Sequence, residues 1–188
     1  MLISSAIGFS WLGMMAVHEL GHAITAWMTG GSVQKVVLPI FGFSRTDLAL
    51  NPRPLLVAWG GAAWGSLLPL GLLLIARRFA PRYAFLATFF AGICLIANGA
   101  YLAGGAWIAA GDAEDILRLG ASRWQLLAFG LPAIAAGLAL TNGLGPNFGW
   151  RQSSGSVDRR AAIAATVMLV AMVIFDLLFT LLQRASVG

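Results

Sequence analysis

The chain has 188 residues, of which 59% are hydrophobic and only 10% are charged. A soluble domain carries roughly 45–50% apolar and about 25% charged residues. A soluble globule of this length could not cover so much apolar surface with polar groups. The same values exclude a disordered chain, a collagen-like repeat and a disulfide scaffold. We therefore expect an integral membrane protein with a single domain over residues 1–188.

The charge of the chain is unbalanced, with 12 Lys and Arg against 7 Asp and Glu, a net charge of +5. In a soluble protein such basicity would indicate nucleic-acid binding. Here the basic residues lie at the ends of apolar runs, where Arg contacts lipid headgroups. The charge pattern thus favours the lipid bilayer as the partner and no nucleic acid.

Apolar runs long enough to cross a bilayer need about 20 residues. We identify five of them, at residues 2–28, 55–76, 84–110, 124–140 and 161–182. All should be helices, because an isolated strand cannot satisfy its backbone hydrogen bonds in lipid. The first run lacks a basic n-region and is too long for a signal peptide, so we expect a retained helix. The predicted fold is an all-α polytopic membrane protein with about five transmembrane helices.

The connection between the first two runs, residues 29–54, differs from the rest. Short apolar segments flank Pro39 and Gly42, which is typical of extended backbone around a turn. A membrane-associated β-hairpin and an ordinary surface loop fit these residues equally well.

Residues 18–22 read His-Glu-Leu-Gly-His, the H-E-x-x-H pattern. On a helix, positions i and i+4 share a face, so His18 and His22 can present two imidazoles to one ion. Zinc suits two imidazoles, one further protein ligand and an open position for water. Glu19 lies beside them, where it can act on that water as general base instead of binding the metal.

The motif is a specific signal in this chain. It contains both histidines of the sequence, and ionisable groups inside a membrane segment are costly and by default functional. The competing interpretation is a polar contact between helices. A second motif, Gly61-x-x-x-Gly65 in the second run, permits close approach of helices, and we favour plain packing over a role in the site.

An H-E-x-x-H within a transmembrane helix resembles the site-2-protease family of intramembrane zinc metalloproteases. The matching stretch is AVHELGHAITAWMTGG at 16–31, and WGGAAWGSLLPL at 59–70 is similar to the family's second core helix. The resemblance covers a core at 1–115, which leaves accessory helices at 116–188. It implies zinc held by two His and a distant Asp, with transmembrane proteins as substrates. Asn98 resembles a family asparagine and is expected to position substrate, although a contact between helices explains it as well.

The third metal ligand is an open choice, because the chain lacks the Leu-Asp-Gly that usually carries it in this family. The first and third runs are parallel, so their C-terminal ends reach the same face, and Asp112 follows the third run. We prefer Asp112 as the ligand. Asp115, three residues further on, is an alternative. Asp176 is another, because it lies at the same depth as His22 in a fifth run that is also parallel to the first.

The predicted function is hydrolysis of peptide bonds in or near transmembrane segments, with Glu19 as general base. The 29–54 segment could offer an edge strand that holds the substrate extended. One alternative is a prenyl-protein type of membrane metalloprotease, which pairs the motif with a later Glu, here only Glu114. Another is a non-catalytic zinc-binding scaffold. We expect a multi-pass protein of a cytoplasmic or inner membrane.

Overall fold

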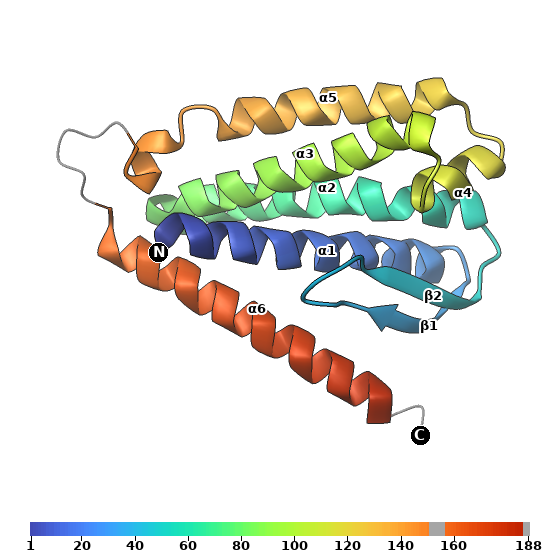
Figure 1. Cartoon of the computed structure of the whole chain (residues 1–188), viewed down its shortest axis with the longest axis horizontal. Coiled ribbons are helices and arrows are strands. Elements are labelled where there is room, and N and C mark those ends of the chain that lie inside the picture. The colour runs from blue at the N-terminus through green and yellow to red at the C-terminus, as the bar shows by residue number, and fades with distance from the viewer. Residues whose placement is uncertain (151–156, 186–188) are drawn as a thin grey trace.

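The computed structural model describes residues 1–150 and 157–185 of the chain. The elements in chain order are α1 (Leu2–Met28), β1 (Ser32–Val37), β2 (Arg45–Leu50), α2 (Pro54–Phe79), a 3₁₀ turn (Pro81–Tyr83), α3 (Ala84–Ile108), α4 (Asp112–Arg118), α5 (Arg123–Thr141), a second 3₁₀ turn (Gly145–Phe148) and α6 (Arg159–Ala185) (Figure 1). The predicted helical fold is therefore confirmed, and a small antiparallel hairpin joins α1 to α2.

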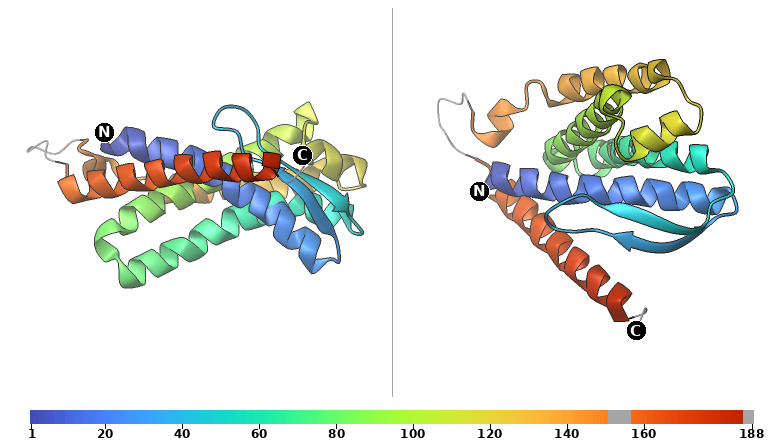
Figure 2. Two further views of the ribbon diagram at one scale, coloured as in Figure 1. Left: turned by 90° about the horizontal axis from the view of Figure 1, so that it is seen from below. Right: turned by 45° about the vertical axis from the view of Figure 1, so that its right-hand side comes forward.

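The long helices pack side by side as a bundle. In this bundle α1 contacts α2, α2 contacts α3, and α3 contacts α5 (Figure 1). The last helix, α6, packs on the N-terminal part of α1 and then diverges from it (Figure 2). The hairpin lies along the C-terminal half of α1 (Figure 1). This arrangement brings the hairpin, the end of α1 and the start of α2 to one end of the molecule.

Four described helices are long and apolar enough to cross a membrane, which makes this a helical membrane protein by length and composition. They are Pro54–Phe79, Pro81–Ile108, Arg123–Thr141 and Arg159–Gln183. We expected about five spans, but by length and hydropathy the described residues contain four, because α1 is not among them. Its bounds, Leu2–Met28, agree with the first predicted run, but His18, Glu19 and His22 lower its hydropathy.

The segment between α1 and α2 is a hairpin, so the alternative of an ordinary surface loop was wrong. The strands pair antiparallel, with Val36 opposite Thr46, and a register irregularity lies between Val33 and Lys35. Gly42 has φ +112° at the turn, a conformation that glycine adopts without strain. Phe41 is 91% exposed beside it. The association of this hairpin with the membrane stays a prediction.

The third predicted run ends earlier than expected, at Ile108 instead of residue 110. Ala109 adopts a left-handed conformation with φ 47°, and Gly111 follows with φ 58°. These two residues turn the chain into α4, a helix of seven residues. Ala113 and Ile116 of α4 are fully buried against Leu102 of α3 and neighbouring residues of α2 and α5. This apolar contact fixes α4, and with it Asp112, on the bundle.

Glycines allow α3 and α5 to approach closely. A Cβ atom added at Gly130 would lie 2.5 Å from the carbonyl oxygen of Gly99, and one at Gly99 would lie 2.7 Å from that of Gly130. Gly137 and Gly92 meet in the same way, seven residues after Gly130 in α5 and seven residues before Gly99 in α3. Small residues at such contacts let helix backbones pack closely in membranes. The α3–α5 pair is thus closely packed, and α3 carries Asn98 and Tyr101 of the site.

Candidate metal centre

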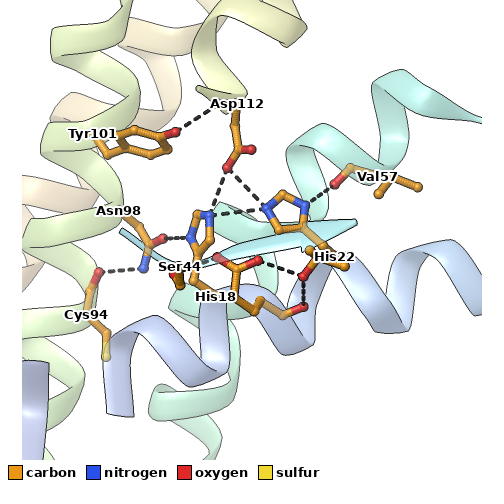
Figure 3. Close-up of polar contacts among 10 residues, drawn as sticks. His18, His22, Ser44, Val57, Cys94, Asn98, Tyr101 and Asp112 are labelled. Atoms are coloured by element: carbon orange, nitrogen blue, oxygen red, sulfur yellow. Dashed lines mark hydrogen bonds and ion pairs between the residues drawn. The ribbon is translucent and has the colours of Figure 1, made fainter. Parts of the chain in front are cut away.

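Three side chains from two distant parts of the chain meet at one point (Figure 3). His18 Nε2 lies 2.8 Å from Asp112 Oδ2, and His22 Nε2 lies 3.1 Å from the same oxygen. The two Nε2 atoms are 3.2 Å apart. The predicted grouping of His18, His22 and Asp112 is therefore present in the structure.

The other ring nitrogen of each histidine is held by an acceptor. His18 Nδ1 lies 2.7 Å from Asn98 Oδ1, and Asn98 Nδ2 donates to the carbonyl of Cys94 at 2.8 Å. His22 Nδ1 lies 2.7 Å from the carbonyl oxygen of Val57. A carbonyl oxygen only accepts, so both Nδ1 atoms carry the proton. In the neutral imidazoles, both Nε2 lone pairs therefore point at Asp112.

Two lone pairs and a carboxylate oxygen facing one another at about 3 Å repel unless a proton or a cation lies between them. A tetrahedral ion with bonds of about 2.0–2.1 Å separates its ligands by about 3.3 Å. The three observed separations, 2.8, 3.1 and 3.2 Å, are close to that value. The residues present thus fit a small divalent cation such as zinc in both donor type and spacing.

Asp112 is prepared to act as an anionic ligand. Burial raises the pKa of its carboxyl, but the contacts with His18 and His22, which donate to it whenever their Nε2 atoms are protonated, outweigh burial and hold that pKa well below its usual range. Its backbone N–H donates to the hydroxyl of Tyr101 at 2.8 Å (Figure 3). A Cβ atom at Gly111 would collide with the same hydroxyl, so glycine is needed there. Tyr101 thereby fixes the start of α4.

The other two candidate ligands lie outside this group. Asp115 accepts a hydrogen bond from Arg118 at 2.6 Å, and its side chain is 50% exposed. Asp176 is buried in α6, and its Oδ1 has no hydrogen-bond partner in the described part of the chain. Of the three candidates, and among the described residues, Asp112 is the carboxylate that lies close enough to both imidazoles to share an ion with them. The geometry favours Asp112 over its two rivals.

Glu19 is buried, with 3% of its surface exposed, and its carboxylate is bound by the hairpin. Ser44 Oγ donates to Oε1 and Thr46 Oγ1 donates to Oε2, each at 2.6 Å. Glu19 lines the same cavity as His18 and His22. It therefore faces this cavity without belonging to the group of His18, His22 and Asp112.

The cavity beside the three ligands has a volume of about 930 Å³. Its walls come from α1, β2 and the residues before it, the start of α2, α3 and α4. Trp11, Met14 and Met15 line an apolar part, whereas Asp115 and Arg118 contribute charge. A space of this size is in the range that holds a ligand or a short peptide segment.

The two glycines of the Gly61-x-x-x-Gly65 motif face the site. A Cβ atom at Gly61 would collide with His22 Nε2 and lie 2.7 Å from His18 Nε2. One at Gly65 would lie 3.0 Å from Asn98 Nδ2. The preference for plain packing at these positions is corrected, because both glycines make room for the imidazoles and for the amide that holds one of them.

Asn98 was expected to position substrate. Both its amide oxygen and its amide nitrogen are engaged, with His18 and with Cys94, and the residue is 2% exposed. Its contacts are those of a residue that orients a metal ligand. The substrate contact stays a prediction.

Several residues of the site were missed by the sequence reasoning: Ser44, Thr46, Val57 and Tyr101. Ser44 and Thr46 carry a usable signal, since hydroxyl residues two apart in an extended segment share a face. Tyr101 follows Asn98 by three residues, which places both on one face of α3. Val57 acts through its backbone carbonyl, for which no sequence signal exists.

Comparisons with known proteins give no relative of this chain: no family model, no curated protein and no solved structure matches it. The geometry of the site is therefore the observation from which a function follows.

Proposed function

We propose that this protein is an intramembrane zinc metalloprotease of the site-2-protease type, which hydrolyses peptide bonds in or near transmembrane segments. The observation that carries the proposal is the convergence of two imidazole lone pairs and a carboxylate, with Glu19 on the same cavity, in a helical membrane protein. In this proposal α1 also lies within the membrane, which is a cytoplasmic or inner membrane.

His18, His22 and Asp112 would hold the zinc ion. Two imidazoles and one carboxylate are a donor set that zinc accepts, and three protein ligands leave one position open, as catalytic zinc sites do. When bound there, the ion would supply a Lewis acid for the scissile carbonyl and lower the pKa of a water molecule. Asn98 and the carbonyl of Val57 would hold both rings with Nε2 directed at the ion.

Glu19 would carry the proton in this reaction. Its carboxylate would accept a proton from the attacking water and deliver it to the nitrogen of the leaving amine. The buried position of Glu19 beside the cavity supports this role. Proton transfer by a positioned carboxylate typically contributes 10²–10⁴-fold in rate.

The substrate would have to be extended at the cleaved bond, because a helical peptide bond is shielded. Ser44, Thr46 and Leu48 line the cavity, so β2 is the strand next to it. On the other side of the hairpin, Gln183 of α6 accepts a hydrogen bond from the Val36 N–H at 3.3 Å. We therefore propose that an extended substrate adds at β2. A flexible Gly/Ser linker in place of the hairpin should lower cleavage while zinc content is kept, and equal activity would refute this part.

A non-catalytic zinc-binding scaffold is the second candidate. It is favoured by one observation, the engagement of both Glu19 oxygens by hydroxyl groups. The prenyl-protein type is less well supported, because Glu114 is exposed on α4 and is not part of the group of ligands.

The decisive experiment combines zinc analysis with cleavage assays on the purified chain in detergent micelles. The probe is a fluorogenic peptide with a Leu/Ala-rich apolar segment. Glu19→Gln should keep zinc and lose at least about 100-fold in rate, whereas Asp112→Ala should lose zinc. Asp115→Ala, on the same short helix, is the matched control for metal binding and should keep zinc. Full activity in Glu19→Gln would refute the protease proposal, and bound zinc without any cleavage would favour the scaffold.

A further inference from the structure

The hairpin holds the carboxylate of Glu19. Ser44 and Thr46 each donate one hydrogen bond of 2.6 Å, one to each carboxylate oxygen. The donors are 25 and 27 residues away from Glu19 in the chain. The side chain proposed to move the proton is thus held by a different element from the one that carries it.

The spacing of the two hydroxyl residues explains how they reach one carboxylate. Arg45 begins β2 and Ser44 directly precedes it, so Thr46 lies within the strand and Ser44 lies at its entry. Side chains at i and i+2 of an extended segment point to the same face. The intervening Arg45 does not contact Glu19 in this way; its side chain is 67% exposed and pairs with Asp47.

These bonds matter because Glu19 is buried. A carboxylate removed from water needs hydrogen-bond donors, or its burial is strongly unfavourable. Hydroxyl–carboxylate bonds of 2.5–2.7 Å are the short, charge-assisted kind, which are stronger than neutral hydrogen bonds. The two contacts therefore stabilise both the orientation of Glu19 and the position of β2 on α1.

The tip of the hairpin has little packing of its own. Phe41 is 91% exposed and Phe43 is 93% exposed, and Ser44 follows directly after them. The hydrogen bonds to Glu19 thus connect α1 to the start of β2, directly after the turn that carries the two exposed phenylalanines. A shift of the tip would act directly on the carboxylate.

We propose that Ser44 and Thr46 are positioning residues for Glu19 and couple the placement of its carboxylate to the position of the hairpin. The catalytic part of this inference rests on the proposed function, whereas the coupling rests on the contacts alone. An extended substrate bound at β2 and the carboxylate of Glu19 would then both be placed by the same short segment, residues 44–46.

The coupling can be measured without any substrate, by limited trypsin digestion of the purified full chain in detergent micelles. The double variant Ser44→Ala/Thr46→Val removes both hydroxyls, and Val keeps the β-branched shape of Thr. Cleavage after Arg45 should become roughly 10-fold faster or more, since two hydrogen bonds to a charged group are lost. Glu19→Ala should give the same increase, and adding it to the double variant should give no further increase. Ser32→Ala, a hairpin hydroxyl on the other strand, is the control and should not change the rate. Unchanged cleavage in both the double variant and Glu19→Ala would overturn the coupling.

The positioning role is tested with the fluorogenic Leu/Ala-rich peptide. The double variant should lower kcat with little change in KM and with zinc content equal to wild type. The exchange Ser44→Thr/Thr46→Ser keeps both hydroxyls and should recover most of the rate. If the exchange variant lost as much kcat as the double variant, the positioning role would be overturned. A wild-type chain that binds zinc but cleaves nothing contradicts the proposed function alone, and faster trypsin cleavage in the double variant still supports the coupling.

Discussion

Substitution of Gly61 by Ala should weaken zinc binding while leaving α2 intact. The added Cβ would collide with His22 Nε2 and lie 2.7 Å from His18 Nε2. Normal carbon–nitrogen contacts are about 3.5 Å, so the imidazoles or α2 must move by roughly 1 Å. Because each ring is held by a hydrogen bond at Nδ1, neither can turn away freely.

The size of the effect follows from this displacement. A shift of about 1 Å in a reactive group can cost about 100-fold in rate, and disturbed ligand orientation typically costs 10–100-fold in metal affinity. We therefore expect zinc affinity to fall at least about 10-fold in Gly61→Ala. Gly65→Ala should have a smaller effect, because its Cβ would lie 3.0 Å from Asn98 Nδ2.

The assay is competition for zinc between the purified variants and a chelating dye. Gly71→Ala is the matched control, because it lies on the same helix and an added Cβ there meets nothing within 4 Å. It should bind zinc like the wild type and be slightly more stable, since Ala is the better helix former. Equal zinc affinity in Gly61→Ala and Gly71→Ala would refute the reasoning that Gly61 makes room for the imidazoles.

Three further predictions follow from the site and its support. Asn98→Ala removes the acceptor for His18 Nδ1 and should lower zinc affinity roughly 10–100-fold, measured by the same dye competition. Zinc should be released on acidification between about pH 7 and 5, where imidazoles take up protons. Because the pKa of Asp112 is lowered, the carboxylate stays ionised there; a zinc affinity that does not change between about pH 7 and 5 would contradict histidine ligation. Gly130→Val should separate α3 from α5 and lower the thermal unfolding midpoint, at a cost of about 1–3 kcal/mol. Gly104→Ala is the control and should leave the unfolding midpoint unchanged, because an added Cβ at Gly104 meets nothing within 4 Å.

The parts of the site that follow from helix geometry were predictable. His18 and His22 meet because positions four apart share a face, and Asp112 was preferred because parallel spans end on one side of a membrane. The left-handed residue at Ala109 was not predictable, because alanine gives no sign of it, and it decides where α3 ends and α4 begins.

Contacts made by small or backbone groups were the least visible in the sequence. Gly61 matters through the side chain that it lacks, and Val57 through its carbonyl oxygen. The role of Asn98 depended on which neighbour its amide met, and only the packing of α1 against α3 decides that. His18, Glu19 and His22 carry the motif of α1 and also lower the hydropathy of this helix, which is not among the four apolar candidate spans of the described residues.

Asp112 is 94 residues from His18 in the chain and sits on a short helix outside the long spans. The metal centre cannot be complete while the ribosome is still making the first three long helices, because its third ligand docks only after α3 has turned into α4. Contacts between such distant residues form late, since a long loop must close first. Zinc uptake would then report the docking of α4 on the first three long helices, and chains stopped before α4 should bind zinc weakly. Pulse-labelled chains released at successive lengths and captured on a zinc resin would measure this order.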